Sequence, residues 1–175
     1  MRMDLSTVGF AQTLPRRIAA SATRFVQGEP LHGLGALTAG VMDTNTFVLA
    51  AADTPVIGTH RFGGIAMKES LPLTTGTLVA QTALASCPIP DLGRIRGKGE
   101  TAASVDTDAE ILGLIGDVTL IDYNATGASD GGELYTIKNV ASADTSGLEI
   151  VEGNAAKGTL DVLVDPRAYR SDVSS

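Results

Sequence analysis

Aromatic residues are scarce in this sequence. Its 175 residues include no tryptophan, three tyrosines and four phenylalanines. Aromatic side chains bury the largest areas, so a core with few of them gains less hydrophobic stabilisation per residue. We therefore expect contacts with other copies of the chain, or with another protein, to bury additional apolar surface.

Cysteine and long apolar segments are also nearly missing. The single cysteine, Cys87, excludes a disulfide bond within the chain and gives no sign of an oxidising compartment. No apolar run reaches the roughly 18 residues of a membrane-spanning helix. No basic segment followed by an apolar one opens the chain, so we expect neither a membrane partner nor a secretory signal.

Positive charge is scarce in the second half of the chain. Residues 1–100 carry a net charge of +2, and residues 101–175 carry −9. An acidic half opposes binding to a phosphate backbone, so we expect no nucleic-acid partner. The mildly basic first half could face an acidic protein surface or reflect ordinary surface variation, and the sequence leaves both interpretations open.

No metal-binding pattern is present. The residues with soft ligand atoms are not spaced as zinc ligands are: His32, His60 and Cys87. Asp106, Asp108 and Glu110 resemble the start of a calcium loop, but Ile111 stands where that loop requires glycine. Alternating carboxylates are more typical of a solvated strand face. We therefore expect no metal and no cofactor.

The glycine-rich motifs predict turns rather than catalysis. Residues 127–131 match the G-x-S-x-G pattern, but a strand-like segment follows Ser129, and both histidines precede it. A nucleophile elbow requires a following helix and a later histidine. Residues 93–99 lack the glycine spacing of a phosphate-binding loop and the hydroxyl residue after Lys98. We therefore expect that the protein is not an enzyme.

The segments that are well defined predict β-strands. Between residues 110 and 165, short stretches rich in Ile, Val, Leu, Thr and Tyr alternate with Gly, Asn, Asp and Ser, which is typical of antiparallel strands joined by tight turns. Residues 159–165 are the clearest case. Their period of two places Leu160, Val162 and Val164 in a core, and Asp161 and its alternate neighbours in water.

Other segments are less regular. Short apolar runs predict further strands at residues 46–52, 60–67 and 76–81. Residues 27–40 are rich in loop-forming residues, and residues 86–93, with two prolines, predict a connector. Residues 100–113 suit either a helix, by their Ala, Glu and Leu content, or a strand, by their alternation, and we favour the strand.

Together these patterns predict a mainly β protein. We expect one or more small barrel or sandwich modules of short antiparallel strands, with an extended N-terminal arm at residues 1–30. Within the arm, residues 15–26 form either a short helix or an extended segment that orders against a partner. The body, residues 31–175, is either one module or two submodules divided near residues 86–93.

The layout resembles the head decoration (cement) proteins of tailed bacteriophages. The similarity lies in a loose arm ending near ATRFVQGEPLHGLGAL, a β segment holding THRFGGIAMKES, and a Gly-rich acidic part ending in GTLDVLVDPRAY. It spans most of the chain and contains no catalytic motif. The resemblance implies a small β-rich protein, often trimeric, on the outer capsid at three-fold and quasi-three-fold positions, with an arm that clamps neighbouring capsid subunits.

We accordingly expect a structural virion protein that is made in the host cytoplasm and seated on the outer capsid surface. It would stabilise the shell by bridging subunits of the major capsid protein and would itself form a homotrimer. The candidate partner-binding residues are Arg16, Arg17, Arg24 and Phe25. Deleting residues 1–30 should then abolish capsid binding and leave a folded body.

Two other function classes stay open. A carbohydrate- or receptor-binding β-sandwich would use exposed aromatic platforms, for which the candidates are Tyr123, Tyr135 and Tyr169. An enzyme would depend on one of the two histidines, His32 or His60.

Overall fold

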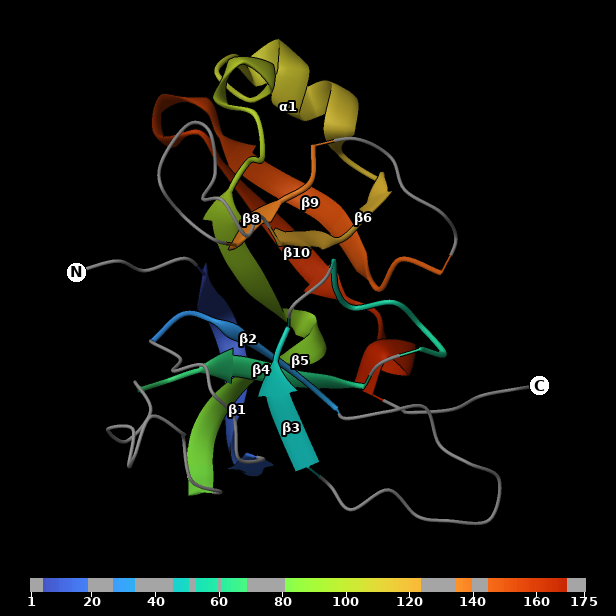
Figure 1. Ribbon diagram of the computed structural model, residues 1–175. Helices are drawn as coiled ribbons and strands as arrows, with labels where there is room; N and C mark the ends of the chain where they lie inside the picture. Colours follow the sequence, from blue (N-terminus) through green and yellow to red (C-terminus); the bar gives the residue numbers. More distant parts are fainter. Residues whose placement is uncertain are drawn as a thin grey trace.

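The computed structural model describes residues 5–18, 27–33, 46–50, 53–59, 61–68, 81–123, 135–139 and 145–169, and these are mainly β (Figure 1). Eight strands form a curled sheet in the order β1-β3-β2-β4-β5-β10-β9-β6, and β7 pairs with β8. The strands are β1 (Leu5–Ile18), β2 (Pro30–Gly33), β3 (Thr46–Leu49), β4 (Phe62–Ala66), β5 (Gln81–Lys98), β6 (Val118–Thr119), β7 (Ile121–Tyr123), β8 (Tyr135–Ile137), β9 (Leu148–Asn154) and β10 (Thr159–Val164). The predicted mainly β class is therefore confirmed.

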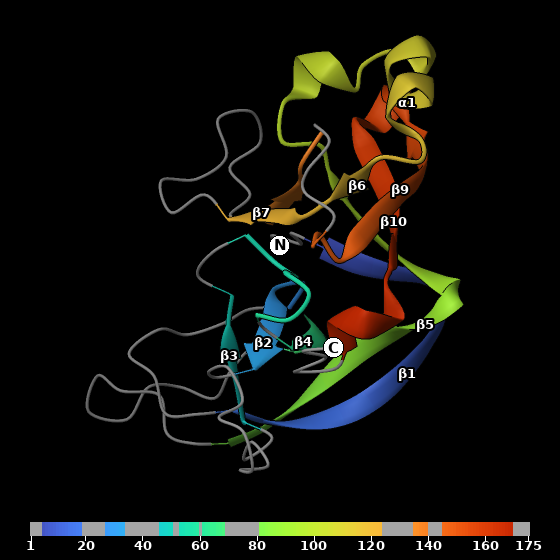
Figure 2. The ribbon, with the colours of Figure 1, turned by 90° about the vertical axis from the view of Figure 1, so that its right-hand side faces the viewer.

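Two long strands, β1 and β5, form an antiparallel ribbon along the lower and right-hand side of the view in Figure 2. Its register extends from Leu5 opposite Gly97 to Ile18 opposite Gln81. We expected an N-terminal arm at residues 1–30, but its described residues 5–18 form a strand of the sheet. Of the two forms left open for residues 15–26, residues 15–18 take the extended one. β1 lacks clear apolar alternation, but β5 supplies backbone hydrogen-bond partners along its length, and both of its ends are buried.

Residues 86–93, predicted to be a connector, lie inside β5. The register shifts between Gly9 and Ala11 of β1, so that Pro90 falls in a bulge. A proline that donates no hydrogen bond is tolerated there, because the bulge interrupts the ladder. The strand is therefore continuous through the predicted division of the body, and the existence of two submodules stays a prediction.

At one end of the ribbon, strand pairings close a ring in the order β1-β3-β2-β4-β5 and back to β1. All of these pairings are antiparallel except β1 with β3, where Ile18 lies opposite Phe47. The side chains buried here are Ile18, Leu31, Phe47, Ala66, Ala85 and Cys87. β3 and β4 lie within the predicted strands 46–52 and 60–67, whereas β2 lies in a region expected to be loop. The strand predicted at residues 76–81 lies, except for Gln81, outside the described residues.

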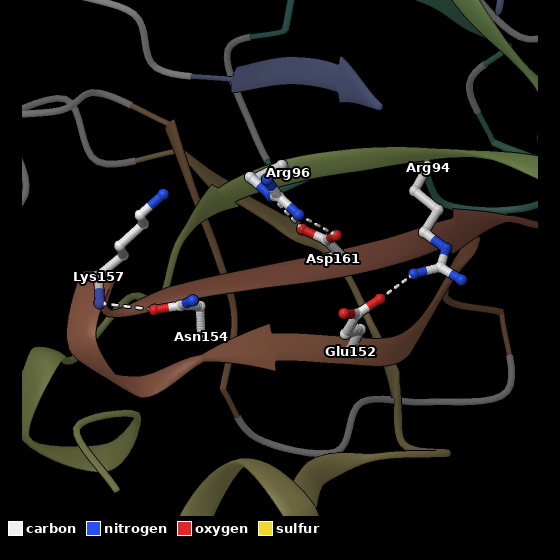
Figure 3. Close-up of polar contacts among 6 residues, drawn as sticks. All are labelled: Arg94, Arg96, Glu152, Asn154, Lys157 and Asp161. Atoms are coloured by element: carbon white, nitrogen blue, oxygen red, sulfur yellow. Dashed lines mark hydrogen bonds and ion pairs between the residues drawn. The ribbon is translucent and has the colours of Figure 1, made fainter. Parts of the chain in front are cut away.

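At the other end of the ribbon, β5 pairs with β10, and β9 and β6 follow in the sheet. These strands enclose the larger core. Leu160, Val162 and Val164 are buried, as their alternation predicted. Asp161 was expected in water but has only 2 % of its surface exposed. It lies opposite Arg96 of β5, which donates Nε to Oδ1 at 2.6 Å and Nη2 to Oδ2 at 2.7 Å (Figure 3). A two-bond pairing with guanidinium allows a carboxylate to be buried.

The single α-helix in the described part of the chain, α1 (Asp108–Leu114), lies where we favoured a strand. Thr107 and Glu110 form a capping box, in which each side chain accepts the backbone N–H of the other residue. This pair satisfies backbone N–H groups at the start of the helix. It therefore favours a helix over the strand that the alternating residues suggested. Ile111 packs on Gly153 of β9, where a Cβ atom would lie 2.8 Å from the isoleucine. No helix among the described residues is long and apolar enough to span a membrane.

Candidate partner-binding surface

The ribbon of β1 and β5 turns sharply at one place, the corner on the right-hand side of Figure 2. Gly9 pairs with Gly93, and the next pair joins Ala11 to Pro88, so residues 89–92 of β5 face only Phe10 of β1. This bulge requires an unusual backbone. Gly9 has a φ of +77°, and a Cβ atom on Gly93 would lie 1.9 Å from the carbonyl oxygen of Phe10. Only glycine fits where the two strands approach so closely.

Three large apolar side chains on this turn are exposed to solvent. Phe10 is 66 % exposed, Leu92 is 60 % exposed and Ile89 is 39 % exposed. We call these three residues the apolar corner. Grouped exposed apolar side chains are a feature of interaction sites.

Two hydrogen bonds hold the turn in place. The hydroxyl oxygens of Thr7 and Ser86 are 2.7 Å apart and join the two arms of the ribbon. The hydroxyl of Tyr169 donates to the carbonyl oxygen of Pro88 at 2.8 Å. The apolar corner is therefore presented by a backbone that is supported from within the fold.

A second exposed surface lies on the arm of the ribbon that joins the ring. Thr13, Pro15 and Arg17 lie opposite Ser86, Leu84 and Thr82 respectively, and directly opposed residues share one face of a sheet. Leu84 is 42 % exposed and Met67 is 38 % exposed. The Thr13 hydroxyl lies 3.5 Å from the Met67 sulfur, which brings Met67 onto this side of the ribbon. We call Thr13, Pro15, Arg17, Met67 and Leu84 the ribbon face.

Arg16 and Arg17 project from opposite faces because side chains alternate along a strand. Arg17 is exposed on the ribbon face, whereas Arg16 is half-buried. Arg16 Nε donates to the Gly63 carbonyl at 2.8 Å, and its guanidinium lies 4.8 Å from the centre of the Phe47 ring. These contacts give Arg16 a structural role, and its predicted binding role stays a prediction. The other two candidates, Arg24 and Phe25, lie outside the described residues.

The only cysteine is placed for packing rather than for reaction. Burial raises the pKa of Cys87, although Arg16, whose guanidinium lies 3.4 Å from the sulfur, opposes the shift. The thiol donates to the Gly63 carbonyl at 3.3 Å. A protonated, buried thiol is a poor nucleophile and a poor metal ligand.

Titratable groups come together around Lys138, after β8. Its Nζ lies 2.6 Å from Asp53 Oδ2 and 3.9 Å from Asp122 Oδ1. Burial raises the pKa of Asp122 to about 6, with further contributions from the negative charges of Glu100 and Asp53, while Lys138 opposes the shift. Asp53 also accepts the backbone N–H of Tyr123 at 3.2 Å. The cluster therefore holds β7 and β8 to the neighbouring loop.

Replacing Asp122 with asparagine is expected to stabilise the protein at pH 8. The pKa of Asp122 in the folded protein, about 6, lies above its ordinary value of 3.8. The contribution of Asp122 to the free energy of unfolding therefore falls as pH rises from about 4 to about 6. After allowance for screening by water, Asp122→Asn should raise the free energy of unfolding by about 1–2 kcal/mol at pH 8. Urea unfolding at pH 8 and pH 4 measures this difference. A variant equally stabilised at both pH values would contradict it.

The other candidate chemistry does not assemble in the described part of the chain. There, no group of three or more His, Cys, Asp or Glu side chains is arranged to hold a metal ion, and the exposed carboxylates of Asp106 and Asp108 belong to the start of α1. His60 and residues 127–131 lie outside the described residues. A groove of about 220 Å³ beside Thr7 and Ser86 is lined by no charged side chain.

The three tyrosines do not form an exposed aromatic platform. Tyr135 is 2 % exposed and donates its hydroxyl to the Ala50 carbonyl at 2.6 Å. The Tyr123 ring packs against it at 5.4 Å between ring centres. Tyr169 is half-buried, and burial strongly raises its pKa. The feature expected of a carbohydrate-binding sandwich is therefore not formed by these residues.

Comparison with known proteins adds no functional assignment. No protein-family model matches this sequence, and no curated protein matches it. Sequence patterns could not reveal the apolar corner, because Phe10 and Leu92 are 82 residues apart and meet only through the register of the ribbon. The available signal in the sequence was glycine at both of the paired positions, Gly9 and Gly93.

Proposed function

We propose that the protein is a structural virion protein that binds the outside of a phage capsid and stabilises the shell by bridging major capsid subunits. The observation that carries the proposal is the apolar corner. Phe10, Ile89 and Leu92 are exposed on a turn whose backbone accepts only glycine at its closest approach. Burying one such side chain in a partner contributes about 1.5–3 kcal/mol, from which the costs of association are subtracted.

A capsid shell is a suitable partner for the apolar corner because it would present the same binding site many times. The apolar corner is held in place by hydrogen bonds within the fold, so it loses little conformational entropy when it docks. In a trimer, three corners would engage the shell together, so that modest single contacts add up to firm attachment. The residues predicted to contact the major capsid protein remain Arg16, Arg17, Arg24 and Phe25. The protein would be made in the host cytoplasm and bound to the outer surface of the capsid.

The test is co-sedimentation with empty shells assembled from the major capsid protein of the same virus. Replacing Phe10 and Leu92 together with serine should weaken binding at least tenfold, because two apolar contacts are lost. Both side chains are largely exposed, so the free energy of unfolding should change by less than about 0.5 kcal/mol each.

The matched control is Ala156→Ser, an apolar-to-hydroxyl change at an exposed residue between β9 and β10, away from the corner. It should bind as the unmodified protein does. Unchanged binding by the double serine variant would refute the role of the apolar corner in shell attachment.

A further inference from the structure

The end of the molecule that carries α1 presents a small apolar stripe among acidic residues. Asp108 and Leu112 are four residues apart, so they are neighbours on the helix surface, and both are exposed. Leu112 is 72 % exposed, and Ile115, just after the helix, is 46 % exposed. We call Asp108, Leu112 and Ile115 the helix stripe; Asp106 beside it is also exposed.

The ribbon face has the same apolar character but the opposite charge. Its exposed apolar side chains, Leu84 and Met67, are accompanied by the exposed cation Arg17, and the exposed Lys68 follows Met67 in the chain. The two surfaces lie at opposite ends of the molecule, since Figure 1 shows α1 at the top and the ring ends of β1 and β5 at the bottom. A single copy therefore cannot bring its own helix stripe onto its own ribbon face.

We propose that the helix stripe of one copy docks on the ribbon face of a second copy. Leu112 and Ile115 would cover Leu84 and Met67, while Asp108 and Asp106 would face Arg17 and Lys68. A second copy is the fitting partner because one chain carries both complementary halves, in apolar content and in sign of charge. Two helix stripes placed together would instead repel each other.

The contact joins two different surfaces, so it is heterologous. Each copy carries one helix stripe and one ribbon face. Repeating the contact gives a closed ring, such as the expected trimer, when the rotation between neighbouring copies closes on itself, and a filament when it does not. The inference rests on the proposed function only for the number of copies in the ring. Pairing of the two surfaces itself follows from the positions and charges of their side chains.

Sedimentation of the full-length protein over a range of concentrations tests the contact. The unmodified protein should associate reversibly, and Asp108→Lys or Arg17→Glu alone should each weaken association at least tenfold by placing like charges together. The chain that carries both substitutions should recover most of the association, because the pair of opposite charges is restored in reverse. Glu149→Lys makes the same charge change at an exposed residue of β9 outside both surfaces and should have no effect.

Since Asp108 also lies in the first turn of α1, Leu112→Ser provides a variant that leaves the helix start intact. It too should weaken association, with an unchanged circular dichroism spectrum. A protein that is monomeric at every concentration, a pair of single variants that associate normally, or a double variant that does not recover would each overturn the inference. The Phe10 and Leu92 serine variant should still self-associate while losing the shell, so failure of this contact and failure of shell binding are distinguishable.

Discussion

Removal of residues 1–18 is expected to leave a chain that does not fold. β1 pairs with β5 along its length, closes the ring through β3, and buries Leu5 and Ile18 at its two ends. Each of these two side chains contributes about 1.5–3 kcal/mol on burial. Together with the lost ladder of hydrogen bonds, this matches or exceeds the roughly 5–15 kcal/mol by which domains of this size are stable.

Far-ultraviolet circular dichroism and urea unfolding measure the outcome. The control is removal of residues 1–4 alone, which leaves every described pairing of β1 in place and should preserve a cooperative transition. A cooperative transition in the chain that lacks residues 1–18 would show that β1 is dispensable. Deleting residues 1–30, the test expected from the sequence, would therefore abolish binding by unfolding the protein, whichever surface binds the shell.

Replacing Arg96 with alanine is expected to destabilise the protein by about 3 kcal/mol, with a range of about 2–4 kcal/mol. The substitution would leave the carboxylate of Asp161, whose side chain is 2 % exposed, without the two hydrogen bonds shown in Figure 3. The paired carboxylate correspondingly raises the pKa of Arg96. Urea unfolding at pH 7 gives the difference in free energy.

Arg94→Ala is the matched control, since Arg94 lies two residues away on β5 and pairs with Glu152. Both members of that pair are well exposed to water, with side-chain exposures of 39 % and 58 %, so its loss should cost less than about 1 kcal/mol. A chain with Arg96→Met and Asp161→Leu should recover most of the stability lost in Arg96→Ala, because it buries no charge. Equal effects of Arg96→Ala and Arg94→Ala would contradict the importance of burial.

Some of the fold could be predicted because the signal is local. In β10, Leu160, Val162 and Val164 alternate and are buried, and period two depends only on the geometry of a strand. At α1 the sequence carries signals for both a strand and a helix. Its alternating carboxylates suggested a strand, but the capping box between Thr107 and Glu110 was present in the sequence and would have favoured the helix.

The sequence by itself determined the β class and the strand at residues 159–164. Only the tertiary structure decided that residues 5–18 belong to the sheet, that Arg16 lies inside the ring while Arg17 is exposed, and that Asp161 is buried against Arg96. The physical reason is that alternation and caps act between residues close in sequence. The pairing of β1 with β5 joins residues about 63 to 92 positions apart, and that register alone brings Phe10 and Leu92 together at one corner.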